Sequence, residues 1–372
     1  MKIVKEYLDF ETFKAKCDQN IYPLVVEKVE KYFSQKEIDE LKKIKSVFIG
    51  SFILGTLSAI GAILSFVYGV SNSFRDNYYK VKLYSALAIL ILSLIFFIIG
   101  FIFLYKFRSA KLIINKKIAN ELGNSDLIYQ KAFKNISAEI EYVTPNDSNF
   151  KTLLSQNDKP HLTKQDLSRV EPDCETPPVL VSSNKIASWI VDNKYPVEYY
   201  FLHWQYVVQR KDRDEIRNVF RGLIKVYNHK MGDKTFDWSL TAGSFSKNWL
   251  AKKLSKGMEL ENREFNSNFT LKADQNNRQN IFRIFTPYAQ ELLVKRINDT
   301  QGTLVNSFKL ISSDNEKSVI YDFVGISSFM QINAKLKLDI QQVIKGYYSD
   351  ILYDSYTFYF LLCFVYIPLY FE

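Results

Sequence analysis

The sequence predicts a membrane-anchored α+β protein, in which a two-helix transmembrane hairpin carries a cytoplasmic, mainly antiparallel sheet domain with flanking helices. Two long, uncharged apolar segments lie in the first third of the chain. The second half alternates stretches rich in aromatic and β-branched residues with turn-forming residues, as strands and hairpins do. Hydrophobic residues make up 47% and aromatic residues 15% of the 372 residues. This content is sufficient for a buried core and excludes a disordered chain.

The two apolar segments, Val47–Val70 and Leu83–Tyr105, are expected to cross the membrane as helices. No charged residue lies between Lys45 and Arg75, and none lies within the second segment. With a rise of about 1.5 Å per residue, the first segment forms a helix roughly 36 Å long, which spans the hydrocarbon core. A secretory signal is a poor alternative, because a charged stretch of more than 40 residues precedes the first segment.

Basic residues flank the outer ends of this hairpin more densely than its loop, Ser71–Lys82. The flanking residues are Lys36, Lys42, Lys43 and Lys45 before the hairpin and Lys106, Arg108, Lys111, Lys116 and Lys117 after it. By the positive-inside rule, both termini and the main domain of this multi-pass cell-membrane protein should face the cytoplasm. Elsewhere basic and acidic residues alternate, so the net charge of +9 favours the lipid bilayer as a partner and argues against nucleic acid.

Small residues recur at every fourth position of the first segment, at Ser51, Gly55 and Ala59. Such a helix-packing ridge lets a second helix backbone approach closely. The second segment has a matching seam of small residues, at Ala86, Ser93 and Gly100. The favoured interpretation is a hairpin that packs on itself, and a homo-oligomer interface is the alternative. Neither segment contains an ionisable residue, which argues against a proton relay through the hairpin.

The chain divides into four expected regions: an amphipathic helical arm (1–45), the transmembrane hairpin (46–106), a helix with a polar, Pro-containing connection (107–196) and the cytoplasmic α+β domain (197–372). Within the arm, Pro23 predicts a kink or the start of a new helix. Ser34 and Glu37 have the spacing of a capping box and predict that a helix restarts there and runs into the first span. The connection from Tyr142 to Pro196 holds six of the nine prolines and is expected to be rich in loops.

The α+β domain is expected to be built mainly of short strands. These are Val197–Gln209, Phe220–Tyr227, Thr235–Leu240, Phe269–Ala273, Leu304–Ile311 and Ser318–Val324. The second and third strands should form a hairpin about Lys230–Asp233, and the last two a hairpin about Ser312–Asn315. Helices are expected at Ser246–Leu254 and Pro287–Ile297. A glycine within a strand, Gly222, indicates a bulge or a close backbone approach.

The C-terminal segment Ser355–Phe371 has no charge and is dense in aromatic residues. It fits a buried core element, an interfacial segment or a third span. Its seventeen residues only just meet the length needed to cross a bilayer. Burial within the α+β domain is therefore the favoured interpretation.

No motif in the sequence predicts a catalytic residue, a cofactor or a metal site. The three histidines (His161, His203 and His229) and the three cysteines (Cys17, Cys174 and Cys363) form no pair at ligand spacing. The run Asp212, Asp214 and Glu215 is interpreted as a solvated loop. Phosphate-loop and nucleophile-elbow patterns are absent from the sequence. Because catalytic groups often meet only in the fold, enzymatic activity stays open.

A series of short motifs resembles a bacterial membrane-protein family catalogued as domain of unknown function number 3137, some of whose members are labelled galanin-like. In chain order the motifs are Ile136-Ser137-Ala138-Glu139-Ile140-Glu141-Tyr142, Phe220-Arg221-Gly222-Leu223, Gly232-Asp233-Lys234-Thr235, Glu264-Phe265-Asn266-Ser267-Asn268-Phe269, Arg283-Ile284-Phe285-Thr286-Pro287 and Ser307-Phe308-Lys309. With the helical arm and hairpin, this resemblance covers most of the chain. It implies a membrane protein of bacterial origin and carries over no catalytic residue.

The expected function is that of a membrane-tethered cytoplasmic domain that binds a protein partner or organises other proteins. The anchor, the sizeable folded domain and the lack of a catalytic signature favour it. A membrane-bound enzyme acting on lipid or envelope precursors is the alternative. It would need a concave pocket with convergent polar groups and perturbed acids.

Overall fold

The structure is a computed structural model. It describes residues 7–72, 79–124, 126–144, 146–157, 161–210, 213–227, 236–242, 257–305, 307–332 and 335–370. The chain forms two compact units. Unit 1 comprises Met1–Leu24, Leu122–Asn333 and Tyr347–Glu372, and unit 2 comprises Val25–Glu121 and Ala334–Gly346.

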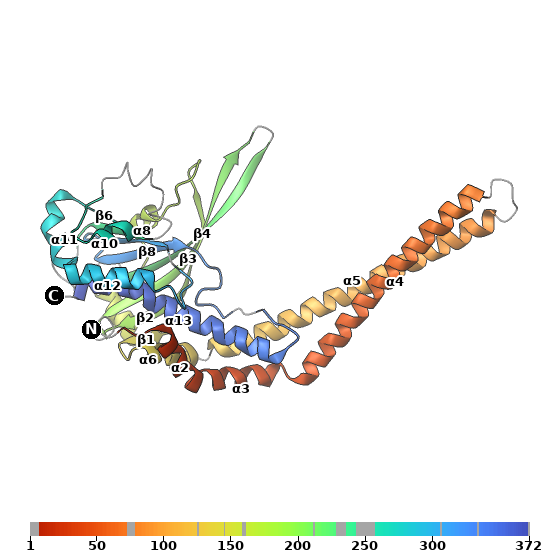
Figure 1. The fold of residues 1–372 in the computed structure, drawn as a ribbon, viewed down its shortest axis with the longest axis horizontal. Coiled ribbons are helices and arrows are strands. Elements are labelled where there is room, and N and C mark those ends of the chain that lie inside the picture. The colour runs from red at the N-terminus through yellow and green to blue at the C-terminus, as the bar shows by residue number, and fades with distance from the viewer. Residues whose placement is uncertain are drawn as a thin grey trace. The chain divides into compact units, whose positions relative to one another are not determined.

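An eight-stranded antiparallel sheet and a set of helices make up the fold (Figure 1). The helices are α2 (Phe10–Asn20), α3 (Tyr22–Tyr32), α4 (Gln35–Asn72), α5 (Tyr79–Asn124), α6 (Asp126–Ile136), α7 (Ser148–Ser155), α8 (Lys164–Arg169), α10 (Arg263–Asn268), α11 (Arg278–Ile284), α12 (Pro287–Asn298) and α13 (Ile340–Tyr370), with a 3-10 turn at Gln275–Asn277. The strands are β1 (Ile140–Val143), β2 (Val179–Val191), β3 (Tyr195–Gln209), β4 (Asp214–Tyr227), β5 (Trp238–Ala242), β6 (Phe269–Ala273), β7 (Phe308–Ser313) and β8 (Ser318–Val324).

The strands lie in the order β1-β2-β3-β4-β8-β7-β5-β6. β3 and β4 pair along their whole length, and their distal part, where Val207 pairs with Ile216, extends past the ends of β2 and β8 as a two-stranded ribbon. Gly222 of β4 faces Phe323 of β8, and a Cβ atom at Gly222 would lie 2.3 Å from the Phe323 ring. The close approach expected at this glycine is confirmed.

The expected hairpin between Phe220–Tyr227 and Thr235–Leu240 is wrong. β4 pairs with β3 and β8, whereas β5 pairs with β6 and β7. The expected pairing fails because β8 occupies the place beside β4. The residues of β8 from Ser318 to Phe323 are all buried, and the strand pairs with β4 on one side and with β7 on the other. The expected turn at Lys230–Asp233 and the expected helix at Ser246–Leu254 lie outside the described residues. The hairpin of the last two expected strands is confirmed, because β7 and β8 pair as antiparallel neighbours.

Regular structure also occurs where the sequence predicts a loop-rich connection. Thirteen residues of this region form β2. The middle of β2, Ser182–Lys185, is polar, the strand is mostly exposed before Ala187, and only Ala187–Val191 is buried throughout. The strand was missed because its polar part forms backbone bonds to β3 without the apolar alternation on which sequence prediction relies. β1, at the end of the expected helical stretch before this region, was missed as well.

The helical arm follows the expected breaks. α2 ends at Asn20 and α3 begins at Tyr22, so Pro23 lies in the first turn of a new helix. α4 begins directly after Ser34, whose backbone N–H donates to the Glu37 carboxylate at 2.9 Å. The expected helix restart is confirmed, and α4 runs without a break to Asn72.

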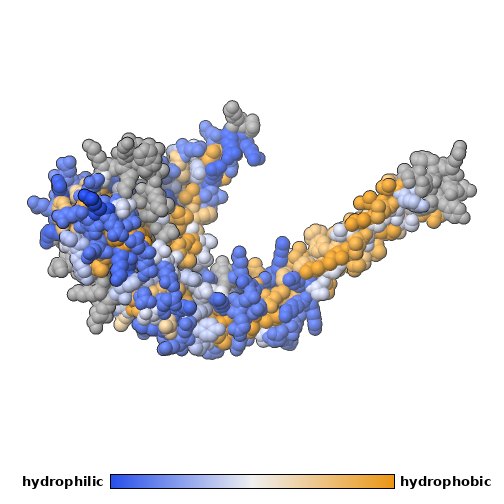
Figure 2. Space-filling view, in the orientation of Figure 1, coloured by the Kyte–Doolittle hydropathy of each residue, from blue (hydrophilic) through white to orange (hydrophobic). Residues whose placement is uncertain are grey.

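Within the described residues, three helices are long and apolar enough to cross a membrane: 35–68 of α4, 83–123 of α5 and 340–369 of α13. They differ in burial. Only 17% of the most apolar window of α4 and 11% of that of α5 are buried. Figure 2 shows the resulting apolar surface along the hairpin. A surface this apolar is typical of helices that contact lipid.

The third apolar helix, α13, is a core element. In its apolar window, 94% is buried, and the part from Tyr347 onward belongs to unit 1. Phe358 stacks on Trp189 of β2 with ring centroids 3.7 Å apart and also contacts Phe133 of α6. Phe364 packs against Phe308 of β7 at 4.8 Å. Of the three interpretations of the C-terminal segment, the structure agrees with the favoured one.

Truncation of a core aromatic of α13 should therefore destabilise the protein far more than truncation of an exposed aromatic of α4. Phe358 is 0% exposed and Phe66 is 51% exposed. We expect Phe358→Ala to lower the free energy of unfolding by about 3–5 kcal/mol, because it leaves a cavity. We expect Phe66→Ala to lower it by less than about 1 kcal/mol. Urea denaturation of the full chain in detergent micelles measures both values. Equal losses in the two variants would contradict the core position of α13.

Candidate functional site

The helix-packing ridge predicted on α4 faces α5. Ser51 and Gly55 are buried and Ala59 is half-buried. The Ser93 hydroxyl of α5 donates to the Gly55 carbonyl at 2.8 Å. A Cβ atom at Gly55 would lie 3.3 Å from the Phe97 ring. The contacts of Gly55 are thus within the hairpin itself.

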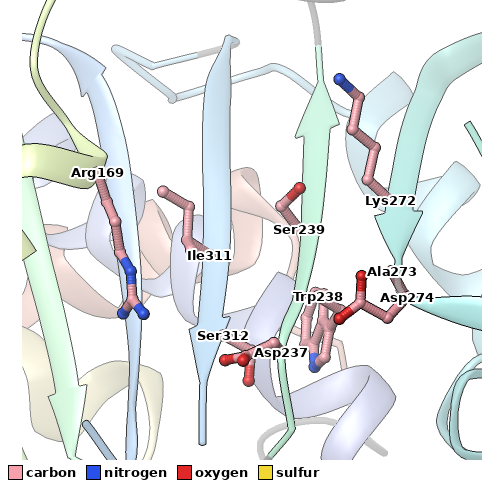
Figure 3. Close-up of a pocket in the computed structure, with 9 residues that line it drawn as sticks. All are labelled: Arg169, Asp237, Trp238, Ser239, Lys272, Ala273, Asp274, Ile311 and Ser312. Atoms are coloured by element: carbon pink, nitrogen blue, oxygen red, sulfur yellow. The ribbon is translucent and has the colours of Figure 1, made fainter. Parts of the chain in front are cut away.

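A pocket of about 470 Å³ lies across β7, β5 and β6 in unit 1 (Figure 3). Its lining residues are Arg169, Asp237, Trp238, Ser239, Lys272, Ala273, Asp274, Ile311 and Ser312. Ser239 pairs with Ile311 on one side and with Lys272 on the other, so the three residues sit side by side across the sheet. Arg169, the last residue of α8, lies on the opposite side of the pocket from Lys272.

The lining carries several polar atoms with unused hydrogen-bonding capacity. The indole N–H of Trp238, the Ser312 hydroxyl and Nη1 of Arg169 are buried and have no hydrogen-bond partner among the described residues. Trp238 is 3% exposed and Ser312 is 2% exposed. A buried polar atom without a partner costs about 1–3 kcal/mol. Trp238 and Ser312 are paired in the register of β5 and β7, and their side chains point to the face of the sheet opposite to that of Ser239 and Ile311.

The position of Trp238 is set by packing. Its ring contacts Phe285 edge-to-face, with centroids 5.3 Å apart, and its backbone lies between β6 and β7. The pocket charges are balanced, since Arg169 and Lys272 are cations whereas Asp237 and Asp274 are anions. Such a site suits a neutral or zwitterionic group with acceptor oxygens.

A charged row continues from the pocket across the sheet, through Lys272 (β6), Lys309 (β7), Asp322 (β8) and Arg221 (β4). Lys309 pairs with Asp322 in the register of β7 and β8, and Arg221 Nη1 lies 3.8 Å from the Asp322 carboxylate. Burial raises the pKa of the Asp322 carboxyl to about 6, although Arg221 and Lys309 favour its ionised form. Burial also lowers the pKa of the Lys309 ammonium.

A second set of polar side chains is buried between α8 and the sheet. Tyr227 and Tyr200 donate to the Glu198 carboxylate at 2.6 and 2.7 Å. Lys225 and Asp166 form an ion pair of 2.6 Å in which both side chains are 0% exposed. We assign this set a structural role, because it ties α8 to β3 and β4 and its charged groups do not reach solvent.

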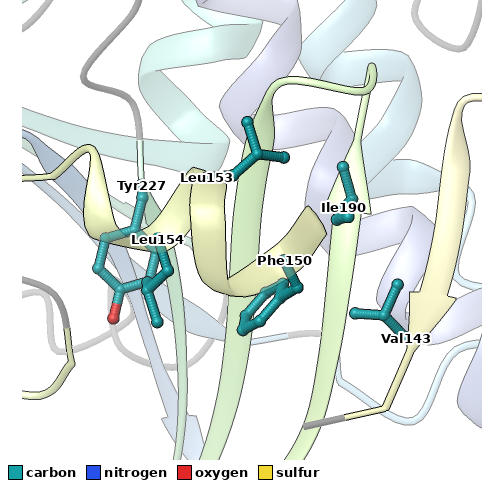
Figure 4. Close-up of a cluster of buried hydrophobic side chains, with 6 residues drawn as sticks. All are labelled: Val143, Phe150, Leu153, Leu154, Ile190 and Tyr227. Atoms are coloured by element: carbon teal, nitrogen blue, oxygen red, sulfur yellow. The ribbon is translucent and has the colours of Figure 1, made fainter. Parts of the chain in front are cut away.

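α7 covers the neighbouring part of the same sheet. Its Phe150, Leu153 and Leu154 point toward the strands, where Val143, Ile190 and Tyr227 meet them (Figure 4). Tyr227 therefore belongs both to this apolar cluster and to the polar set around Glu198. α7 and α8 cover the sheet near β1 to β4, whereas the pocket lies over β5 to β7.

The histidines and the acidic residues singled out in the sequence do not lie together in one site. Nε2 of His203 lies 2.8 Å from Asn218 Oδ1 on the exposed ribbon, and the His161 backbone N–H donates to Tyr227. Glu215 forms ion pairs with Arg210 and Arg217. His229 and Asp212 lie outside the described residues. Where the structure describes the chain, no group of three or more His, Cys, Asp or Glu residues could hold a metal ion.

No family model matches the chain, and no curated protein or solved structure matches it either.

Asp322 gives the fold a testable pH dependence. Its folded pKa of about 6 exceeds the ordinary value of 3.8, so the folded chain holds a proton that the unfolded chain releases between these pH values. This proton uptake stabilises the fold, and the stabilisation is complete below about pH 4. As the pH rises through 6, the free energy of unfolding falls by about 3 kcal/mol.

The variant Asp322→Asn should abolish this component, because an amide stays neutral at every pH. Thermal unfolding of the full chain in detergent from pH 4 to pH 7 measures the slope. The variant Asp173→Asn, at an exposed position, should keep the wild-type slope. A wild-type slope in Asp322→Asn would show that Asp322 does not titrate as assigned.

Proposed function

We propose that this protein is an integral membrane protein whose α4–α5 hairpin anchors a cytoplasmic α+β domain, and that this domain binds or organises a partner at the membrane surface. The observation that carries the proposal is the difference between the apolar helices. α4 and α5 expose their apolar side chains along most of their length, whereas α13 is buried by its own domain. A protein that buries one such helix and exposes two requires lipid around the exposed pair.

The charge of the flanks supports the cytoplasmic orientation. Lys42, Lys43 and Lys45 precede the first span, and five basic residues follow the second. The positive-inside rule places this end of the hairpin, and with it both termini, in the cytoplasm. The order of the short motifs further supports a distant relation to the bacterial family of domain 3137.

Membrane extraction and tag accessibility test the anchor. The full chain with a tag after Glu372 should remain in the membrane pellet after an alkaline wash and leave it only with detergent. The tag should resist protease in intact cells and become cleavable in inverted vesicles. A periplasmic protein of the same cells serves as the control for intactness. Release by the alkaline wash would contradict the anchor, and cleavage in intact cells would contradict the orientation.

For the binding role, the pocket on β7, β5 and β6 is the site we favour. Its Ser239 hydroxyl and its Lys272 ammonium, which lie side by side on β5 and β6, can both donate to a bound group. A peptide segment fits this need, because its carbonyl oxygens are acceptors and its net charge is near zero. A membrane-bound enzyme remains the second candidate, since Asp237 and Asp274 place two carboxylates in the same pocket.

Cross-linking in cells tests the pocket. We expect the wild type to yield a reproducible neighbour whose recovery falls at least about fivefold in Ser239→Ala/Lys272→Gln, because each lost donor weakens binding by roughly 1 kcal/mol. Ser155→Ala/Lys151→Gln is the matched control, since it changes an exposed serine and an exposed lysine of α7 that lie outside the pocket. Equal recovery from all three chains would exclude the pocket. Conversion of a membrane lipid that depends on Asp237 would favour the enzyme.

A further inference from the structure

The positive charge of the chain is concentrated at the hairpin. Eleven of the 49 basic residues and one of the 40 acidic residues lie between Leu41 and Asn120, so the rest of the chain carries 38 basic and 39 acidic residues. Eight of the eleven lie at the end of the hairpin that is joined to the arm and the sheet domain. We call these eight residues the basic collar: Lys42, Lys43, Lys45, Lys106, Arg108, Lys111, Lys116 and Lys117.

Two members of the collar face each other across the helices. Phe48 of α4 packs against Phe107 of α5 with centroids 5.6 Å apart, and the Lys111 ammonium lies 5.5 Å from the Phe107 ring. The charges of Lys45 and Lys111 are close enough to repel each other. Two ammonium groups that repel each other favour an anion between them.

The sequence has no carboxylate between Glu40 and Asp76, and none between Asp76 and Glu121. Asp76 is the one acid between Leu41 and Asn120, and in the sequence it falls between α4 and α5. The next acid along α5, Glu121, is bound by Lys28 and Lys31 at 3.2 Å each. The counter-anion of the Lys45–Lys111 pair must therefore come from outside this stretch of helix.

Exposed apolar side chains lie among the same basic residues. Tyr105 is 74% exposed, Leu112 is 55% exposed and Ile113 is 50% exposed. Their exposed surface requires an apolar environment, which a soluble phosphate cannot supply. A phospholipid supplies both components, because its phosphate pairs with the ammonium groups and its acyl chains cover the apolar side chains.

We propose that the basic collar binds the headgroups of anionic phospholipids, with one phosphate held between Lys45 and Lys111. This inference rests on the anchor proposed above and specifies the lipid that the anchor selects. Removal of both ammonium groups is expected to weaken binding at least about tenfold, since each basic residue near an anionic surface contributes roughly a factor of five.

Lipid titration of the purified full chain in a neutral detergent tests this proposal. Native mass spectrometry and the thermal unfolding midpoint are followed with phosphatidylglycerol, phosphatidylcholine and inorganic phosphate. Phosphatidylglycerol should bind and raise the midpoint, and the other two should have little effect. Lys45→Gln/Lys111→Gln should lose most of the response. Lys131→Gln/Lys134→Gln, with two exposed lysines of α6, should respond like the wild type.

Each contrary outcome would contradict one part of the proposal. Equal responses to phosphatidylglycerol and phosphatidylcholine would exclude selection of anionic lipid. An equal response to inorganic phosphate would exclude a lipid as the source of the anion. A full response in Lys45→Gln/Lys111→Gln would exclude the pair as the binding position. In all three cases, retention in alkaline-washed membranes would leave the anchor itself intact, so the two proposals fail separately.

Discussion

The packing of α13 against the sheet is the contact on which unit 1 depends. Side chains on several sides of this helix are buried by different elements: Phe358 by β2 and α6, Phe364 by β7, and Tyr356 by Phe13 of α2. Aromatic side chains bury large areas and are stiff, so such contacts define one arrangement of the surrounding elements. α2 and α13 thereby belong to the same core.

Polar groups explain why α13 is buried in protein although its composition resembles a membrane span. The Asp354 carboxylate accepts from the Tyr129 hydroxyl at 2.8 Å and from the Met330 N–H at 2.9 Å. The Thr357 hydroxyl accepts from the Leu304 N–H at 2.8 Å. These groups need partners from other parts of the chain, which a bilayer does not provide. α4 and α5 carry no ionisable residue in their central apolar segments and can be solvated by lipid.

Polar side chains on the part of the sheet that helices cover stabilise the fold, whereas those on the uncovered part are accessible. Near β1 to β4, α7 and α8 cover one face, and the Glu198 and Lys225–Asp166 groups are enclosed there. Over β5 to β7 the pocket leaves the Lys272 side chain exposed and the Ser239 side chain half-buried. The same sheet thus holds polar side chains that stabilise the fold and others that can bind a ligand.

The sequence alone determined the features that depend on local physics. The length and apolarity of α4 and α5, the break at Pro23, the helix start after Ser34 and the strands β3, β6 and β8 follow from composition and periodicity over short windows. The burial of the C-terminal segment could be favoured from its length. The carboxylate that required this burial, Asp354, stands one residue before the segment and was the available signal.

The tertiary structure decided what depends on partners distant in the chain. β8 inserts between β4 and β7, so the neighbours of β4 and β5 cannot be deduced from the turn that the sequence predicts after β4. The polar middle of β2, Ser182–Lys185, forms part of a strand because β3 offers it backbone partners. The pocket joins α8, β5, β6 and β7, whose residues carry no common motif. Local patterns encode which segments form helices and strands, whereas the partner of each segment is selected by burial across the whole core.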